Sequence, residues 1–184
     1  RRTAFALIAM ADGATRFGEV EEYPWTTGLL TSYEYEYGAY AQDIAANFPD
    51  STVGLFYAIK SLPHPDALAT LAAEGASFDV ATSGELDLLR GIGVDPAATI
   101  HTHPIKRERD IRDALDFGCK IFVVDNIDEL AKFEAFGAQA RLLLRVSFRG
   151  KGVVSDLSRK FGCEPGAVPW LLTEAARIGV PVIG

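Results

Sequence analysis

Lys60 is the residue in this sequence whose type and position most directly suggest chemistry. It ends the apolar run Val53–Lys60, on a strand face otherwise occupied by Gly54, Phe56 and Ala58. A strand that continues to this point buries the lysine stem and desolvates the amine, which lowers the pKa of the amine. An uncharged amine is a nucleophile that can form a Schiff base with a carbonyl group. The alternative is a lysine that has left the strand and reached solvent, because most lysines are exposed.

Arg145 is a second charged residue near the end of a strand-like run, Arg141–Val146. One face of this run is apolar, and the other is mixed and contains Arg145. We expect the apolar faces of both runs to pack on helices and the mixed faces to point inward. This arrangement places Lys60 and Arg145 at the C-terminal ends of parallel strands, where α/β barrel enzymes have their active sites.

The elements that would position these residues alternate between strand-like and amphipathic runs from about Gly28 onward, as in βα units. The predicted strands are Gly28–Tyr33, Val53–Lys60, Ser77–Ala81, Thr99–His103, Lys120–Val124, Arg141–Val146 and Val180–Ile183. The predicted helices lie near Tyr35–Phe48, Pro65–Glu74, Ser83–Ile92, Lys106–Phe117, Ile127–Phe136 and Glu164–Ile178.

Helix ends are marked by residues suited to capping. Thr82 or Ser83 precedes Glu85, and Asp125 or Asn126 precedes Glu129, which predicts side-chain caps at two helix starts. Glycine follows five of the amphipathic runs, where a left-handed residue commonly ends a helix. These glycines are Gly75, Gly93, Gly118, Gly137 and Gly179.

The fold class predicted from this order is α/β, either an open doubly wound sheet or a (β/α)8 barrel. The alternation within the strands favours the barrel, incomplete here with about seven βα units. Residues 1–27 break the pattern, and their strand-like run Thr3–Ala9 suggests a short β segment that belongs to a neighbouring domain. We therefore interpret residues 28–184 as a partial barrel, either a fragment or a chain completed by other polypeptide.

Composition excludes several classes of function. A net charge of -7 leaves no basic stripe for a nucleic acid. The sequence shows neither a membrane-length apolar run nor a signal peptide, so we expect a soluble cytoplasmic protein. Cys119 and Cys163 have no metal-ligand spacing with each other or with the three histidines, so we predict reduced, structural thiols and no metal site.

Four motifs, taken together and in order, resemble a known family. They are Phe56–Lys60, Phe78–Glu85, Leu142–Val146 and Leu157–Gly162. Between about Tyr33 and Gly184 the chain resembles the pyridoxal-phosphate-dependent decarboxylases of ornithine, lysine, arginine or diaminopimelate, which share the alanine racemase fold. The resemblance implies an N-terminal (β/α)8 TIM-type barrel of the alanine racemase type that binds pyridoxal 5'-phosphate.

The resemblance also implies roles for individual residues. Lys60 matches the lysine that binds the cofactor in the resting enzyme, Asp79 and Glu85 match acidic residues near that lysine, and Arg145 matches an arginine beside the cofactor ring. Without the resemblance, Asp79 and Glu85 are equally well explained as a helix cap and a first-turn acid. Arg145 is equally well explained by a salt bridge inside the barrel.

Two further segments relate to the family pattern, one as a similar loop and one as a departure from it. Gly150–Gly162 is similar to the mobile active-site loop of the family, although a solvated loop is the alternative. His101-Thr102-His103-Pro104-Ile105-Lys106 stands where many relatives have an aromatic residue followed by Ala-Asn-Pro-Cys-Lys. This departure suggests a difference in substrate or chemistry at that strand end. As isolated residues, both histidines are predicted to be hydrogen-bonded wall residues.

The function implied is decarboxylation of a diamino acid, ornithine or lysine, to a polyamine-type amine by a homodimer. The Leu157–Gly162 motif favours this branch over diaminopimelate decarboxylation and over racemisation. A non-catalytic regulatory or binding homologue remains the alternative from a different class. Because further family landmarks would follow Gly184, we expect the chain by itself to bind the cofactor poorly and to be inactive.

Overall fold

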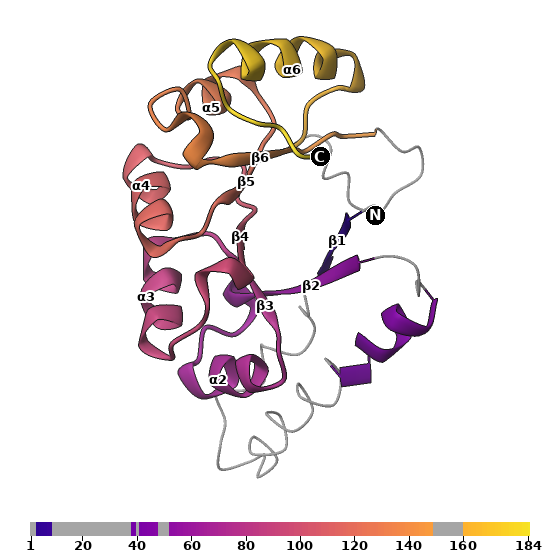
Figure 1. The fold of residues 1–184 in the computed structure, drawn as a ribbon, viewed down its shortest axis with the longest axis vertical. Coiled ribbons are helices and arrows are strands. Elements are labelled where there is room, and N and C mark those ends of the chain that lie inside the picture. The colour runs from indigo at the N-terminus through magenta and orange to yellow at the C-terminus, as the bar shows by residue number, and fades with distance from the viewer. Residues whose placement is uncertain (1–2, 9–37, 40, 48–51, 149–159) are drawn as a thin grey trace. The chain divides into compact units, whose positions relative to one another are not determined.

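The computed structural model describes residues 3–8, 38–39, 41–47, 52–148 and 160–184. The chain divides into two compact units, Arg1–Thr99 and Ile100–Gly184, and each is described by itself. Figure 1 shows the alternation of strands and helices within each unit. No helix in the described residues is long and apolar enough to cross a membrane.

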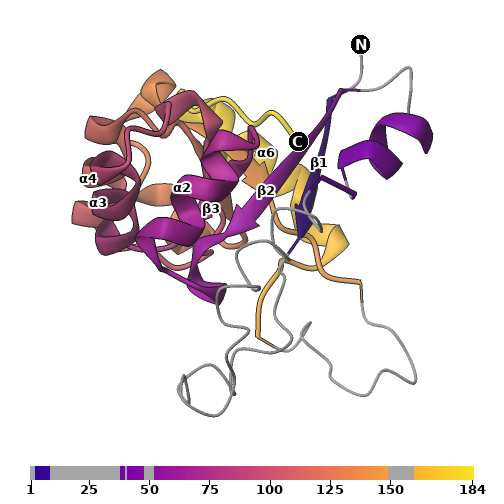
Figure 2. The same ribbon diagram turned by 90° about the horizontal axis from the view of Figure 1, so that it is seen from below.

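The described residues of the first unit form three parallel strands. They are β1 (Thr3–Ile8), β2 (Thr52–Ala58) and β3 (Ser77–Val80), and β2 pairs with both of the others. β1 lies beside β2 along its whole length (Figure 2). The register of β2 and β3 places Ala58 opposite Asp79, which brings the residues that end these two strands together.

Two helices follow β2 and β3 and bury their apolar residues. α2 (Pro65–Ala73) follows the short 3-10 turn η2 (Ile59–Ser61), and α3 (Ser83–Gly91) follows β3 directly. The Thr82 hydroxyl accepts a hydrogen bond from Glu85 N (3.3 Å), which confirms a predicted cap. The turn η3 (Pro96–Ala98) ends the unit.

The second unit repeats the βα pattern. β4 (Thr99–His101), which begins one residue before the division, leads into α4 (Glu108–Phe117), β5 (Ile121–Val124), α5 (Ile127–Ala131) and β6 (Arg141–Leu144). β5 pairs in parallel with β4 and β6. α6 (Val168–Arg177) lies against α5 (Figure 1). The 3-10 turns η4 (Gly137–Gln139) and η6 (Pro165–Ala167) precede β6 and α6.

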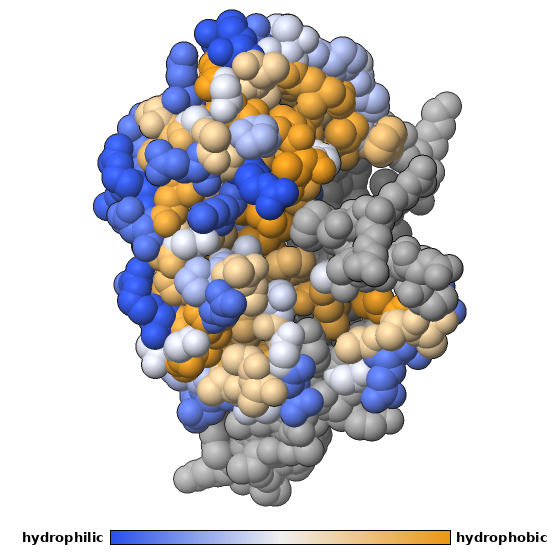
Figure 3. All heavy atoms as spheres, viewed as in Figure 1, coloured by the Kyte–Doolittle hydropathy of each residue, from blue (hydrophilic) through white to orange (hydrophobic). Residues whose placement is uncertain are grey.

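The helices of the second unit are amphipathic, and α4 shows this most clearly. Ile111 and Ala114 are fully buried, whereas Arg109, Arg112 and Asp113 are exposed. The surface over α4 is correspondingly hydrophilic in Figure 3. Asn126 caps α5 with its side-chain oxygen, which accepts from Glu129 N at 2.9 Å and confirms the second predicted cap.

The α/β class with parallel strands is confirmed, and several predicted boundaries change. The predicted strand Val180–Ile183 contributes only an isolated bridge, Leu142↔Val182. The predicted helix Ile127–Phe136 ends at Ala131. All five glycines predicted to end helices have positive φ angles, which confirms that part of the pattern.

Some predictions fall on residues outside the described ranges. The predicted strand Gly28–Tyr33 and most of Gly150–Gly162 belong to this group, and Tyr35–Phe48 is described only at 38–39 and 41–47, where it is helical. β1 pairs with β2, but the proposed domain boundary after residue 27 stays a prediction. Cys119 and Cys163 are buried, and the structure places neither of them in a disulfide with another described residue.

Candidate active site

Lys60 lies just beyond the C-terminal end of β2, at the position in the fold that the sequence predicted. Its side chain is exposed, so the interpretation as a buried, desolvated amine is wrong and the alternative, a lysine that has left the strand and reached solvent, is confirmed. β2 ends at Ala58, and Lys60 is the middle residue of the turn η2, where the two-residue alternation of a strand no longer applies. Ala58 and Ile59 are buried at 1% and 0% exposure. The amine is therefore anchored by a buried backbone and remains accessible to a carbonyl compound.

Two carboxylates lie near this amine within the first unit. Asp79 is 5% exposed in β3, opposite Ala58, and Glu85 is 9% exposed in the first turn of α3. Both Lys60 and Asp79 are close enough to Glu85 to act on its ionisation. The structure thus brings together three of the four predicted site residues, and Arg145 belongs to the second unit.

Glu85 has a structural role that the capping pattern predicted. Its Oε2 atom accepts hydrogen bonds from Ala81 N (2.5 Å) and Thr82 N (3.2 Å). Burial raises the pKa of this carboxyl above 4.5, with a smaller contribution from Asp79, while the two backbone N–H groups and Lys60 act in the opposite direction.

Arg145 follows β6 directly, at a strand end as predicted. Its backbone N–H donates to Val124 O at 2.9 Å, and its side chain is half-buried. The guanidinium carbon lies 5.1 Å from the centre of the Phe161 ring. Among the residues that the structure describes, no carboxylate pairs with this guanidinium, so the salt-bridge alternative finds no partner there.

His101 lies between the sheet and the helices of the second unit. His101 is 1% exposed, and its ring stacks on the Phe122 ring with the two centroids 5.8 Å apart. Phe122 in turn contacts Phe133, beyond the end of α5. Neither ring nitrogen of His101 has a hydrogen-bond partner in the described part of the chain, so the prediction of a hydrogen-bonded wall residue is wrong.

The environment of His101 keeps its imidazole neutral. Burial lowers the pKa of His101 from 6.5 to about 3, and electrostatic interaction with Lys106 and His103 acts in the same direction. Asp110 opposes this shift only weakly. His101 is therefore a neutral core residue, and its ring packs against Phe122 as the ring of an apolar aromatic residue would.

His103 differs from His101 because its side chain is exposed beyond the end of β4. Its Nδ1 atom lies 2.7 Å from Ile105 O and 3.2 Å from Ile105 N, so it donates to the carbonyl in one tautomer and accepts from the backbone N–H in the other. Its ring makes an edge contact with Phe161, with centroids 6.2 Å apart and planes at 70°. The two histidines of the unusual motif thus have different environments.

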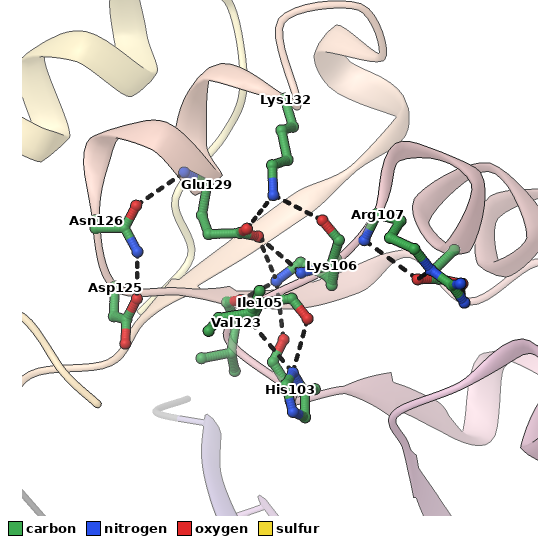
Figure 4. A network of polar contacts seen from close by, with 10 residues as sticks. His103, Ile105, Lys106, Arg107, Val123, Asp125, Asn126, Glu129 and Lys132 are labelled. Atoms are coloured by element: carbon green, nitrogen blue, oxygen red, sulfur yellow. Dashed lines mark hydrogen bonds and ion pairs between the residues drawn. The ribbon is translucent and has the colours of Figure 1, made fainter. Parts of the chain in front are cut away.

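The interpretation of the sequence missed a buried network centred on Lys106 (Figure 4). The Lys106 side chain is 0% exposed, and its ammonium donates to Val123 O (2.6 Å) and His103 O (2.9 Å). Glu129 Oε2 lies 3.5 Å from the ammonium and accepts from Lys106 N at 3.1 Å. Lys132 pairs with Glu129 and donates to Lys106 O.

This network links the segment after β4 to β5 and α5. Burial lowers the pKa of Lys106 from 10.5 to about 8, although Glu129 acts in the opposite direction. The pairing could not be inferred from the sequence, because Lys106 and Glu129 are far apart along the chain. The only local signal was the Asn126 cap that places Glu129 in the first turn of α5.

Replacing Lys106 with methionine is expected to lower the free energy of unfolding by about 3 kcal/mol. The substitution leaves the buried carbonyl group of Val123 and the partly buried carbonyl group of His103 without this donor. Urea denaturation measures the change, with the exposed Lys120→Met as a control that should have little effect. An unchanged unfolding midpoint for Lys106→Met would contradict the structural role of the network.

The fold and these sites define a class: an α/β protein with parallel strands and charged side chains beyond the C-terminal ends of the strands. Comparison with known proteins identifies the family within this class. Residues 38–184 match the pyridoxal-dependent decarboxylases, in their pyridoxal-binding domain. This chain therefore belongs to that family.

Several relatives are similar over most of this chain. The lysine/ornithine decarboxylase of Selenomonas ruminantium is 34% identical over 71% of this chain and 33% of its own length. The ornithine decarboxylase of Schizosaccharomyces pombe is 35% identical over 80% of this chain and 34% of its own length. The chain thus spans about a third of the length of these relatives.

A solved structure shows the same fold. The lysine/ornithine decarboxylase of Vibrio vulnificus, crystallised with putrescine, matches with a TM-score of 0.72 and 43% sequence identity. The match covers 84% of this chain and 39% of that one. The similarity therefore extends over most of this chain.

Proposed function

We propose that the protein containing this chain decarboxylates a basic amino acid, ornithine or lysine, with pyridoxal 5'-phosphate and with Lys60 as the residue that binds the cofactor. The observation that supports this most directly is the accessible amine of Lys60 beside Asp79 and Glu85. The substrates named for the related enzymes of Selenomonas ruminantium and Vibrio vulnificus support the choice of amino acid.

The residues present fit the cofactor. An exposed primary amine on a rigid turn can reach an aldehyde, and the guanidinium of Arg145 has donors for which the described residues provide no carboxylate. When bound, pyridoxal phosphate supplies an electron sink for the carbanion left by loss of carbon dioxide. We assign the cofactor contacts to Lys60, Asp79, Glu85 and Arg145.

The side chains of this chain contribute binding, orientation and proton transfer. Lys60 provides the amine, and the turn η2 holds its backbone at the end of β2. Glu85 is fixed by its cap to α3 and has a raised pKa, and Lys60 is near enough to influence its ionisation, so this carboxyl group can exchange a proton with the amine. Asp79 adds negative charge beside Glu85, which favours that proton on the carboxyl group.

The full-length protein provides the test. Addition of pyridoxal phosphate is expected to produce a visible absorption band, and ornithine or lysine is expected to release carbon dioxide and the corresponding diamine. Diaminopimelate and arginine are assayed in parallel. A band without amine formation would indicate a non-catalytic homologue, and inversion of the amino acid without loss of carbon dioxide would indicate a racemase. Either result would contradict the proposal.

We also propose that this protein acts as a cytoplasmic homodimer on its small-molecule substrate. The family resemblance in the sequence supports the dimer. Light scattering on the full-length protein is expected to give twice the mass of one chain, and the mass of a single chain would contradict this part of the proposal.

A further inference from the structure

We propose that Phe161 and His103 position the guanidinium of Arg145, so that an aromatic ring holds this arginine at the strand end. The inference rests on the proposed function, because it gives Arg145 a cofactor to contact. It makes Phe161 and His103 positioning residues that act through Arg145.

The first observation concerns how Arg145 is held. An arginine side chain loses rotamer entropy when it is fixed in one position, so something must hold it there. In the described part of the chain, the contact that does so is the Phe161 ring, 5.1 Å from the guanidinium carbon. The ring attracts the cation through its quadrupole. A carboxylate would use the N–H donors of the guanidinium, whereas a ring leaves them available for an oxygen ligand.

The second observation concerns how Phe161 is held. The segment around it pairs with the chain that extends β6, through a parallel bridge between Val146 and Cys163. Cys163 N donates to Arg145 O, and Ser147 N donates to Cys163 O, each at 2.8 Å. The backbone of Arg145 itself is therefore hydrogen-bonded to the segment that contains the ring, which fixes the distance between the two residues.

Gly162 closes this arrangement. Its N–H donates to Asp125 Oδ2 at 2.8 Å, which joins the segment to the end of β5. Its φ of +97° is in the left-handed region, and a Cβ atom here would lie 2.7 Å from Ser147 Cβ. Only glycine therefore allows this close approach to the extension of β6. Phe161 is held by backbone pairing on one side and by this turn on the other.

The third observation concerns His103, whose exposed ring makes the edge contact with Phe161. His103 is itself fixed, because the Ile105 backbone hydrogen-bonds to its Nδ1 atom and the buried Lys106 ammonium binds its carbonyl. The contact sequence thus runs from the Lys106 network through His103 and Phe161 to Arg145. This gives the unusual histidine a packing role beside the ring.

The test is a double-mutant cycle on the binding of pyridoxal phosphate to the full-length protein, with the dissociation constant measured by titration of the visible band. Phe161→Leu is expected to raise the dissociation constant about fivefold and Arg145→Met at least as much. The double variant should bind no more weakly than Arg145→Met alone, because the ring acts through the arginine. Phe161→Tyr keeps the ring and should restore binding to within about twofold of the original protein.

Phe136→Leu provides a matched control. Phe136 also faces an arginine, since the Arg112 guanidinium lies 5.9 Å from its ring on another part of the second unit. Removal of this ring should leave the dissociation constant unchanged. His103→Asn, which restores the residue common in the family, should raise the dissociation constant about twofold in the original protein and have no effect in Phe161→Leu.

The outcomes separate this inference from the function on which it rests. If Arg145→Met leaves cofactor binding unchanged, the assignment of Arg145 in the proposed function fails, and the inference fails with it. If Arg145→Met weakens binding but the effect of Phe161→Leu is absent or simply adds to it, the inference alone is wrong. If Phe161→Leu does not fold, as judged by circular dichroism, His103→Asn is measured in the original protein and in Arg145→Met. It should weaken cofactor binding about twofold in the first and have no effect in the second, and an equal effect in both would contradict the inference.

Discussion

Replacing Lys60 with alanine is expected to abolish the visible band of the bound cofactor and to lower the decarboxylation rate at least about 1,000-fold, equivalent to roughly 4 kcal/mol in activation free energy. The reason is chemical, because no other amine is described beside Asp79 and Glu85 to react with the aldehyde. Absorbance spectroscopy and amine release on the same preparation measure both effects.

Two variants control this experiment. Lys60→Arg keeps the positive charge near Glu85 but removes the primary amine, so it should also lack the band. Lys120→Ala removes an exposed lysine in front of β5 and should retain both the band and the activity. If Lys60→Ala keeps the band, another lysine binds the cofactor and the central assignment is wrong.

Lowering the pH is expected to destabilise the protein through His101. The pKa of this residue is about 3 in the folded state and 6.5 in the reference state. Below about pH 6.5, His101 therefore binds a proton in the unfolded chain but remains neutral in the folded chain. Stability should fall by roughly 1.4 kcal/mol per pH unit, to a total on the order of 5 kcal/mol near pH 3. Above pH 6.5 this contribution is constant.

Comparison with His101→Phe isolates this effect from the titration of carboxylates. The phenylalanine keeps an aromatic ring beside Phe122 but cannot take up a proton. Urea denaturation of both proteins between pH 7.5 and 4.5 should give curves of stability that diverge below pH 6.5, with the variant less sensitive to acid. Parallel curves would show that His101 is protonated or hydrogen-bonded in the folded protein.

Local patterns in the sequence were sufficient for much of the fold. The caps at Thr82 and Asn126 and the glycines that end the helices depend on interactions within a few residues, and the structure confirms them. The same holds for Lys60 and for Arg145, each of which lies just beyond the end of a strand in its own unit, because the end of a strand-like run can be located from local sequence. The four sequence motifs were sufficient to predict the family, which the match of residues 38–184 confirms.

The errors have a common physical cause. Exposure of Lys60 depends on where β2 stops hydrogen bonding, and a two-residue alternation cannot show that the chain leaves the strand after Ala58. Burial of His101 depends on Phe122, which is brought beside it only by the pairing of β4 with β5. In both cases the burial of a side chain depends on contacts with other segments, which the pattern of its own strand does not contain.

The sequence by itself therefore determined the α/β class, the family and the residue types available for chemistry, because these are properties of local order and of motifs. Only the tertiary structure decided which charges meet. Lys106 forms an ion pair with Glu129, and the Arg145 guanidinium contacts the Phe161 ring. In both pairs the two residues are far apart along the chain. Such pairs form because burial of a charge is unfavourable without a partner, and the partner is whichever group the packing of strands and helices brings within reach.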